Sequence, residues 1–133
     1  MHDDQENSEQ INIPAAEKVM DLGECLERTR HDKDLLLELV KIFKKDFQKH
    51  REKLTLAVGR EDWEQIKEIA HFFKGASANI SAHILYAVFS RLEKSAEEKD
   101  SAKIFVLLNL LDQAFEEFMK FTHNLNKKLR AVH

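Results

Sequence analysis

The sequence predicts an all-α protein, an antiparallel up-down-up-down four-helix bundle with a short extra helix on its N-terminal side. The 133 residues include only three glycines and one proline, so few positions can break a helix. Apolar residues recur at intervals of three and four, the spacing of one face of an amphipathic helix. Strand signals are absent from the sequence.

The N-terminal segment, residues 1–13, holds four acidic residues and little to bury. We expect this segment to be a disordered acidic tail, with the helical bundle domain over residues 14–133. Pro14 is suited to the first position of a helix, where its missing N–H is tolerated. The short first helix is therefore predicted over residues 15–28, with Gly23 as the position at which it could be interrupted.

Aspartates mark the starts of the next two helices. Asp32 is suited to be the N-cap of a long helix that runs to about residue 57 and is ended by Gly59. Asp62 opens a third helix that runs to about residue 80. The apolar stripe of the second helix is Leu36, Leu39, Val40, Phe43, Phe47, Leu54 and Ala57, and that of the third is Ile66, Ile69, Phe73, Ala76 and Ile80.

Two further helices complete the predicted bundle. A short break near Ser81 leads to a helix over residues 82–99, and Asp100 or Ser101 marks the next turn and cap. The last helix is predicted to run without a break to about residue 130. The nine phenylalanines of the chain fall mostly on the apolar stripes of these helices, so we assign them to the core.

One histidine lies on the polar side of the third helix. At about 100° per residue, His71 falls opposite the apolar stripe, with Lys74 and Gly75 about one turn further on. A glycine inside a helix costs about 1 kcal/mol relative to alanine, and it is kept where something must approach the backbone closely. A mobile lysine ammonium suits an anion that arrives and leaves, such as a phosphoryl group.

These residues form the pattern His-x-x-Lys-Gly-x-Ser at His71, Lys74, Gly75 and Ser77. The pattern resembles the signature of histidine-containing phosphotransfer (HPt) domains, and the resemblance in helix order and length extends over about residues 20–129. One departure is that the family often has Gly-Ala after this stretch, where this chain has Ser81 and Ala82.

The resemblance implies a phosphocarrier that accepts a phosphoryl group from a receiver-domain aspartate and passes it to another receiver in a two-component phosphorelay. His71 would be the phospho-acceptor, Lys74 would stabilise the phosphoryl group, and Gly75 would give access. The partners would be response-regulator receiver domains, with a hybrid histidine kinase as a further candidate. The expected partner-binding face comprises Lys67, Glu68, Phe72, Ala78 and Asn79.

A second hypothesis is a non-phosphorylated interaction module that docks and inhibits a receiver or kinase. No nucleotide-binding motif is present, so we expect a phosphotransfer intermediate without autokinase activity rather than an enzyme. We expect no cofactor and no metal. Glu68 and His71 supply half of a di-iron helix-bundle signature, but no second Glu-x-x-His follows.

Composition and charge bear on the kind of partner and on the cellular location of the protein. The net charge of -3 argues against a nucleic-acid partner, which usually needs a concentrated basic face. No apolar run approaches the roughly 18 residues of a membrane span, and the acidic N-terminus does not resemble a signal peptide. Cys25 is the single cysteine, which favours a reducing compartment, so the protein is expected to be cytoplasmic. The phosphocarrier hypothesis further expects a monomer.

Overall fold

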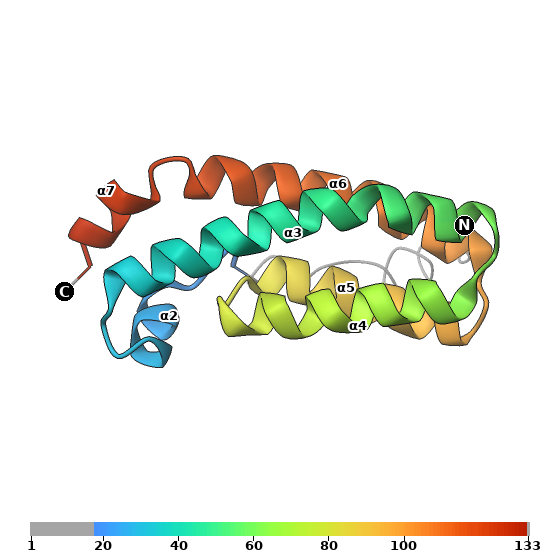
Figure 1. Ribbon diagram of the computed structural model, residues 1–133, viewed down its shortest axis with the longest axis horizontal. Coiled ribbons are helices and arrows are strands. Elements are labelled where there is room, and N and C mark those ends of the chain that lie inside the picture. The colour runs from blue at the N-terminus through green and yellow to red at the C-terminus, as the bar shows by residue number, and fades with distance from the viewer. Residues whose placement is uncertain (1–17, 133) are drawn as a thin grey trace, which may run out of the picture.

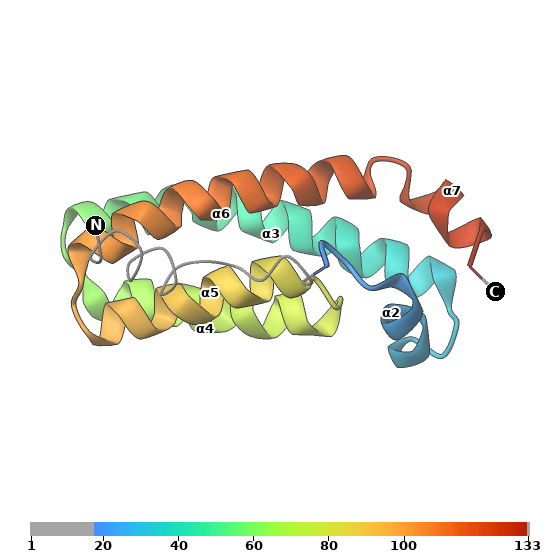
Figure 2. The same cartoon turned by 180° about the vertical axis from the view of Figure 1, so that it is seen from behind.

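The computed structural model describes residues 18–132, which form an antiparallel helical bundle without strands (Figure 1). Within these residues, four long helices lie side by side, and two short helices lie at one end of them (Figures 1 and 2). The all-α prediction is confirmed. The expected acidic tail and Pro14 lie outside the described residues. The helices are α2 (Leu22–Arg28), α3 (Lys33–Gly59), α4 (Trp63–Asn79), α5 (His83–Glu97), α6 (Ser101–Thr122) and α7 (Leu125–Arg130).

Three of the predicted N-caps are confirmed. The carboxylates of Asp32, Asp62 and Asp100 each accept a hydrogen bond from the backbone N–H three residues later, at 3.0, 3.2 and 3.1 Å. Each bond satisfies a donor that the helix itself leaves free. The starts of α3, α4 and α6 are therefore set locally by the sequence.

The first helix begins later than predicted. Residues 18–20 are not helical, and α2 starts at Leu22 with Asp21 as its N-cap. The preceding backbone is instead hydrogen-bonded to the α4–α5 turn, because Asp21 N–H donates to Ser81 O at 3.0 Å and Ile84 N–H donates to Lys18 O at 3.1 Å. Gly23 lies inside α2 and does not interrupt it.

The predicted last helix is in fact two helices. Helix α6 ends at Thr122 and α7 begins at Leu125. At the break, Lys128 Nζ donates to Phe121 O at 2.6 Å, which satisfies a carbonyl at the end of α6. Leu125 and Leu129 are buried, and α7 packs against α3. Their spacing continues the stripe of α6, so periodicity alone could not show the break.

The turns between the long helices share one geometry. Glu61, Ser81 and Lys99 all have left-handed backbones, with φ of 54°, 51° and 55°. The next residue in each turn donates its N–H to the carbonyl five residues earlier, at 2.9 Å in all three cases. HPt domains often have glycine at the position of Ser81. Ser81 therefore adopts a left-handed backbone conformation that glycine would adopt at a lower free-energy cost.

Aromatic side chains from all four long helices meet in the core. The Phe73 ring packs against Phe43, Phe47 and Phe89, with centroids 5.9, 5.8 and 5.5 Å away, and Phe118 lies 5.3 Å from Phe43. The buried phenylalanines are Phe43, Phe47, Phe73, Phe89 and Phe118, as predicted, but the core assignment is wrong for Phe72 and Phe105, which are 55% and 68% exposed. Because the Phe73 face of α4 is buried, the opposite face of this helix is turned toward the surface.

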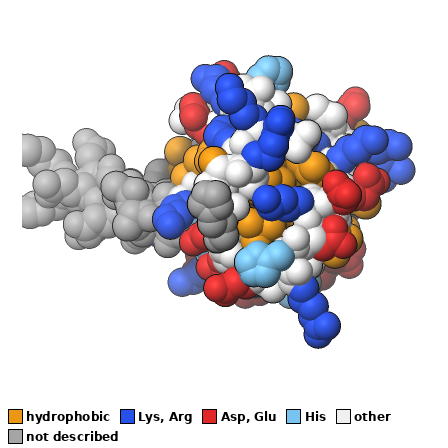
Figure 3. Space-filling model, turned by 90° about the vertical axis from the view of Figure 1, so that its left-hand side faces the viewer, with side chains coloured by type: hydrophobic (Ala, Val, Ile, Leu, Met, Phe, Trp, Pro, Cys, Tyr) orange, Lys and Arg blue, Asp and Glu red, His pale blue; other side chains and the backbone are white. Residues whose placement is uncertain are grey.

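The end of the bundle that carries α2 and α7 is shown in Figure 3. Over the described residues of this view, basic and acidic side chains are interspersed, and apolar side chains show between them. Within residues 18–132, charges of both signs are therefore present at this end, and α7 contributes Lys127, Lys128 and Arg130 to it. No helix within residues 18–132 is both long and apolar enough to cross a membrane.

Candidate functional site

His71 lies near the middle of α4 on its solvent-facing side. The opposite face of the helix is buried through Ile66, Ile69, Ala70, Phe73 and Ser77. The His71 side chain is 70% exposed, so a reactant in solution can reach the imidazole. The amphipathic pattern of α4 is therefore what presents this ring at the surface.

A carboxylate on the neighbouring helix contacts both predicted polar residues of the motif. Glu93 of α5 places Oε2 2.8 Å from His71 Nδ1 and Oε1 2.6 Å from Lys74 Nζ. Its side chain is only 13% exposed, whereas that of Lys74 is 26% exposed. Glu93 was not predicted from the sequence as a residue of this site. In the structure, Nδ1 is held by Glu93.

Mutual hydrogen bonding favours the charged forms of Glu93 and Lys74. The Lys74 hydrogen bond holds the pKa of the Glu93 carboxyl below its usual value against the opposing effect of burial, and the His71 contact adds to the lowering. The same hydrogen bond raises the pKa of the Lys74 ammonium. Glu93 is thus a carboxylate at neutral pH and can only accept hydrogen bonds.

The acceptor role of Glu93 determines where the imidazole proton lies. Nδ1 of His71 must carry the hydrogen that is donated to Oε2, so in the neutral ring Nε2 keeps its lone pair. This nitrogen is the one farther from the backbone. An exposed imidazole with a free lone pair is a competent nucleophile near neutral pH, and a lysine ammonium lies within the same hydrogen-bonded group.

Gly75 leaves open space beside His71. A β-carbon added at Gly75 would meet no atom outside its own helix backbone within 4 Å. The packing of this chain therefore does not require glycine there. We predicted that Gly75 lets a partner approach His71. The open space on this side of α4 agrees with that prediction.

An apolar groove runs between α3 and α4 beside the histidine. It is lined in part by Leu39, Ile42, Phe72 and Ala76, with Asn79 at one side. Phe72 is 55% exposed, yet its ring also stacks on His50 of α3, with centroids 6.3 Å apart. Phe72 therefore fills part of the helix seam and also contributes exposed apolar surface.

The other residues predicted for the partner-binding face also lie on α4. Glu68 and Asn79 are exposed, and Lys67 and Ala78 are partly exposed. Glu68 borders a second small pocket with His50 and Phe72. The structure thus places all five predicted residues on the surface around His71, but it does not show what binds there.

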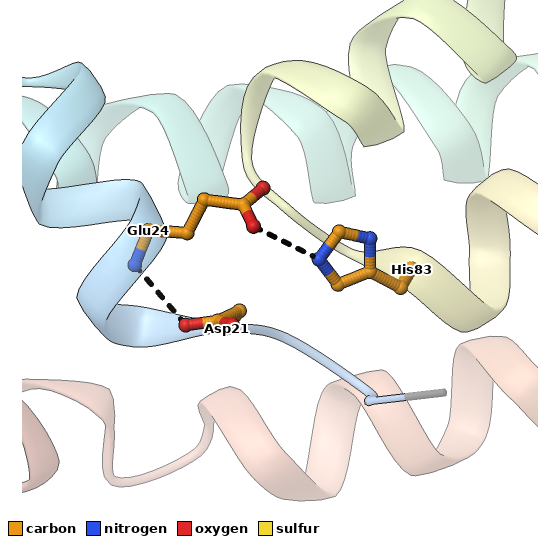
Figure 4. A group of neighbouring side chains, drawn as sticks. All are labelled: Asp21, Glu24 and His83. Atoms are coloured by element: carbon orange, nitrogen blue, oxygen red, sulfur yellow. Dashed lines mark hydrogen bonds and ion pairs between the residues drawn. The ribbon is translucent and has the colours of Figure 1, made fainter. Parts of the chain in front are cut away.

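One other group of side chains has the chemistry of a metal site. Asp21, Glu24 and His83 meet where α2 lies against the start of α5, and one ligand atom from each lies within 4.8 Å of the others (Figure 4). The carboxylates already have partners. Ser81 Oγ donates to Glu24 at 2.8 Å, and Asp21 caps α2. We interpret the group as a polar contact that holds α2 in place.

The fold and site define a class of protein, a helical bundle that presents an exposed histidine beside a lysine. The family comparison agrees, because the model of the Hpt domain matches residues 38–117. The chain belongs to the Hpt domain family. The matched span contains all of α4 and α5, and with them His71, Lys74, Gly75 and Glu93.

Membership of this family gives the broad function. Hpt domains are phosphotransfer modules of two-component signalling, and they carry a phosphoryl group rather than act as enzymes. They interact with receiver domains and kinases. Neither the search of curated proteins nor the search of solved structures found a match for this chain.

Proposed function

We propose that this protein is a histidine phosphocarrier that accepts a phosphoryl group from a receiver aspartate and passes it to a second receiver. The observation that carries the proposal is His71, an exposed imidazole whose Nδ1 is hydrogen-bonded while Nε2 faces away from that contact. Lys74 and Gly75 on the same side of α4 would provide charge and access. The protein would act as a cytoplasmic monomer.

The proposed transfer is a displacement at phosphorus. The Nε2 lone pair of His71 forms the N–P bond while the O–P bond to the receiver aspartate breaks, and the aspartate leaves as a carboxylate. Such transfers need little covalent chemistry from the protein, and they depend on position and on charge stabilisation of the phosphoryl oxygens. The receiver would supply the acidic pocket and its magnesium ion.

Lys74 would stabilise the phosphoryl group once it is attached. Its ammonium lies one turn from His71 and is held at 2.6 Å by Glu93, within the polar group that surrounds the imidazole. A phosphoryl group brings more negative charge than the free ring, so Lys74 should matter more after transfer than before it.

The proposed docking surface comprises Lys67, Glu68, Phe72, Ala78 and Asn79 together with the apolar groove beside Phe72. Its position next to His71 supports this assignment, because a receiver must bring its aspartate to the ring while it is bound. Phe72→Ala should weaken binding of an unphosphorylated receiver, since the half-exposed ring is the largest apolar group of this face. Measuring the same receiver's affinity for Lys67→Ala would separate apolar from charged contributions.

The deciding experiment is transfer from a panel of receiver domains labelled on their aspartates. Wild-type protein should gain acid-labile, base-stable label, and His71→Gln should gain none. His123→Gln is the matched control, because His123 is another exposed histidine at the end of α6. Label on His71→Gln at the wild-type rate would refute the assignment.

The same experiment tests the second candidate, an interaction module that blocks a receiver or kinase. That function requires the docking surface but not a reactive imidazole. It would be favoured if wild-type protein bound receivers tightly, took up no label from any of them, and bound equally well as His71→Gln. The carrier is the preferred candidate because His71 is exposed and its Nδ1, not its Nε2, is hydrogen-bonded to Glu93.

A further inference from the structure

A small pocket beside His71 lies between α3 and α4. The residues that line it are His50 of α3 and Glu68, Ile69, Phe72 and Phe73 of α4. The volume of the pocket is about 170 Å³, whereas a cavity that holds one water molecule needs only roughly 10–15 Å³. The pocket is therefore large enough to take the end of a side chain from a docked protein.

The wall of this pocket is made of three aromatic rings in contact with one another. The centroid of the His50 ring lies 6.3 Å from that of Phe72 and 5.5 Å from that of Phe73, and the two phenylalanine centroids are 5.0 Å apart. Phe73 is buried, whereas Phe72 is half-exposed. The face of an aromatic ring carries partial negative charge and attracts a cation that lies within about 6 Å of its centroid. The wall therefore suits a side chain with an apolar stem and a positively charged end.

Two hydrogen-bond acceptors at the pocket are unpaired within residues 18–132. His50 Nδ1 donates to the backbone carbonyl of Asp46 at 2.9 Å, so Nε2 of the neutral ring keeps its lone pair. Glu68 is exposed, and the ion pairs that α4 makes within these residues are with Glu93 alone. No lysine or arginine is among the residues that line the pocket. The Glu68 carboxylate is therefore available to a cation from outside.

We propose that this pocket binds the guanidinium group of an arginine that a docked receiver domain presents. This inference rests on the proposed function, and it adds the chemistry of one contact between the two proteins. A guanidinium stacks on aromatic faces and donates several hydrogen bonds, so it can contact the Phe72 ring, the Glu68 carboxylate and His50 Nε2 at the same time. A lysine ammonium has no flat face to stack, so lysine should bind less tightly.

The position of the pocket gives this contact a role in orienting the receiver. Glu68 lies three residues before His71 and Phe72 directly follows it, so the pocket borders the imidazole on the α3 side, whereas Glu93 borders it on the α5 side. Apolar contacts alone define the rotation of a docked protein poorly, and a charged contact at a fixed place sets its register. An arginine held in the pocket would thereby keep the receiver aspartate directed at His71.

The first measurement needs no receiver. N-acetyl-arginine methylamide is the probe, and NMR follows the ring signals of His50 and Phe72 as it is added. Wild type should bind this probe more tightly than the uncharged N-acetyl-norleucine methylamide, and Glu68→Gln should bind it roughly two- to tenfold more weakly than wild type. Glu64→Gln is the matched control, because Glu64 is an exposed glutamate one turn earlier on α4 that does not line the pocket.

Two results of the probe titration would overturn the inference. Equal binding of the arginine and norleucine probes would show that the pocket is only an apolar niche. An equal loss in Glu64→Gln and Glu68→Gln would show a general effect of charge rather than a contact at this pocket.

The second measurement is the Kd of an unphosphorylated receiver that labels His71. Glu68→Gln should weaken this binding by the same roughly two- to tenfold, and Glu64→Gln should leave it unchanged. Replacing the surface arginines of the receiver by glutamine, one at a time, should then identify one arginine whose loss costs much less affinity in Glu68→Gln than in wild type. If no arginine of the receiver were coupled to Glu68 in this way, the proposed contact would be wrong.

The outcomes distinguish this inference from the proposed function. If receivers labelled His71 while Glu68→Gln bound them with wild-type affinity, the pocket contact would be refuted and the phosphocarrier would stand. If no receiver bound the protein or labelled His71, the phosphocarrier would be refuted, and with it the assignment of the arginine to a receiver. The probe titration would in that case still show whether the pocket binds a guanidinium group.

Discussion

Substitution of Gly75 tests whether glycine is needed there for access of a partner or for the stability of α4. A new β-carbon meets nothing within 4 Å, so Gly75→Ala introduces no clash and gains the helix propensity of alanine. The free energy of unfolding should rise by about 0.5–1 kcal/mol, which corresponds to an increase in Tm of roughly 2–6 °C for a domain of this size. Glycine therefore makes this protein less stable than it could be.

A larger side chain at the same position should separate stability from transfer. Gly75→Leu adds atoms on the histidine side of α4, where they would obstruct an approaching receiver. An obstruction of about 1–3 kcal/mol, the usual cost of forcing extra atoms into a packed contact, would slow transfer roughly 5- to 150-fold. The melting temperature should not fall, because a β-carbon at this exposed position meets no atom within 4 Å and leucine has a higher helix propensity than glycine.

The assays are thermal unfolding followed by circular dichroism and stopped transfer reactions from a labelled receiver. Gly59 provides the control, because it is also helical, also has open space around it, and lies at the far end of α3. Gly59→Leu should leave the transfer rate unchanged. If Gly75→Leu transferred phosphate at the wild-type rate, the access role of the glycine would be wrong and another cause would have to be found.

Three further predictions concern the core and the charged group. Phe73→Ala should lower the free energy of unfolding by about 3–5 kcal/mol, because it leaves a cavity among Phe43, Phe47 and Phe89. In denaturant titrations, half-exposed Phe72→Ala should cost clearly less, and equal losses would contradict this packing. Glu93→Gln should be less stable than wild type at neutral pH. Since the folded-state pKa of Glu93 lies below its model-compound value of 4.5, the difference should be fully present above that pH and vanish as pH falls through the folded-state pKa; a gap that persisted in acid would contradict this. Lys74→Ala should shorten the lifetime of the phosphoprotein, by about tenfold for each 1.4 kcal/mol of charge-assisted bonding lost. Receiver binding should weaken much less. Lost binding with an unchanged lifetime would make Lys74 a docking residue.

The helical architecture could be predicted because its determinants are local. Asp32, Asp62 and Asp100 cap their helices through side-chain bonds to backbone donors three residues away, and such bonds are visible as short sequence patterns. The stripe of α4 predicted in the same way that Phe73 would be buried and His71 exposed. Each of these inferences needs only the residues within one or two turns.

The features that could not be predicted depend on distant parts of the chain. Helix α2 starts at Leu22 because Asp21 caps it and donates its N–H to Ser81, which lies on another turn. The break before α7 lets Leu125 and Leu129 reach the core near α3 without disturbing the apolar spacing. Only the packing of α5 on α4 brings Glu93 to His71 and Lys74. In the sequence, nothing distinguishes Glu93 from other glutamates on the predicted helices.

Because the turn at Ser81 has a fixed left-handed geometry, the number of residues between His71 and Glu93 determines whether their side chains meet. The turn closes α4 through two backbone hydrogen bonds, from Ser81 N–H to Ala78 O and from Ala82 N–H to Ser77 O, and α5 then starts at once. One residue more or fewer within α5 before Glu93 would rotate the carboxylate by about 100° away from the imidazole. The separations of 22 residues from His71 and 19 from Lys74 are therefore fixed quantities. In other chains with the same turn, a carboxylate that contacts the histidine and the lysine can therefore be sought by its spacing in the sequence alone.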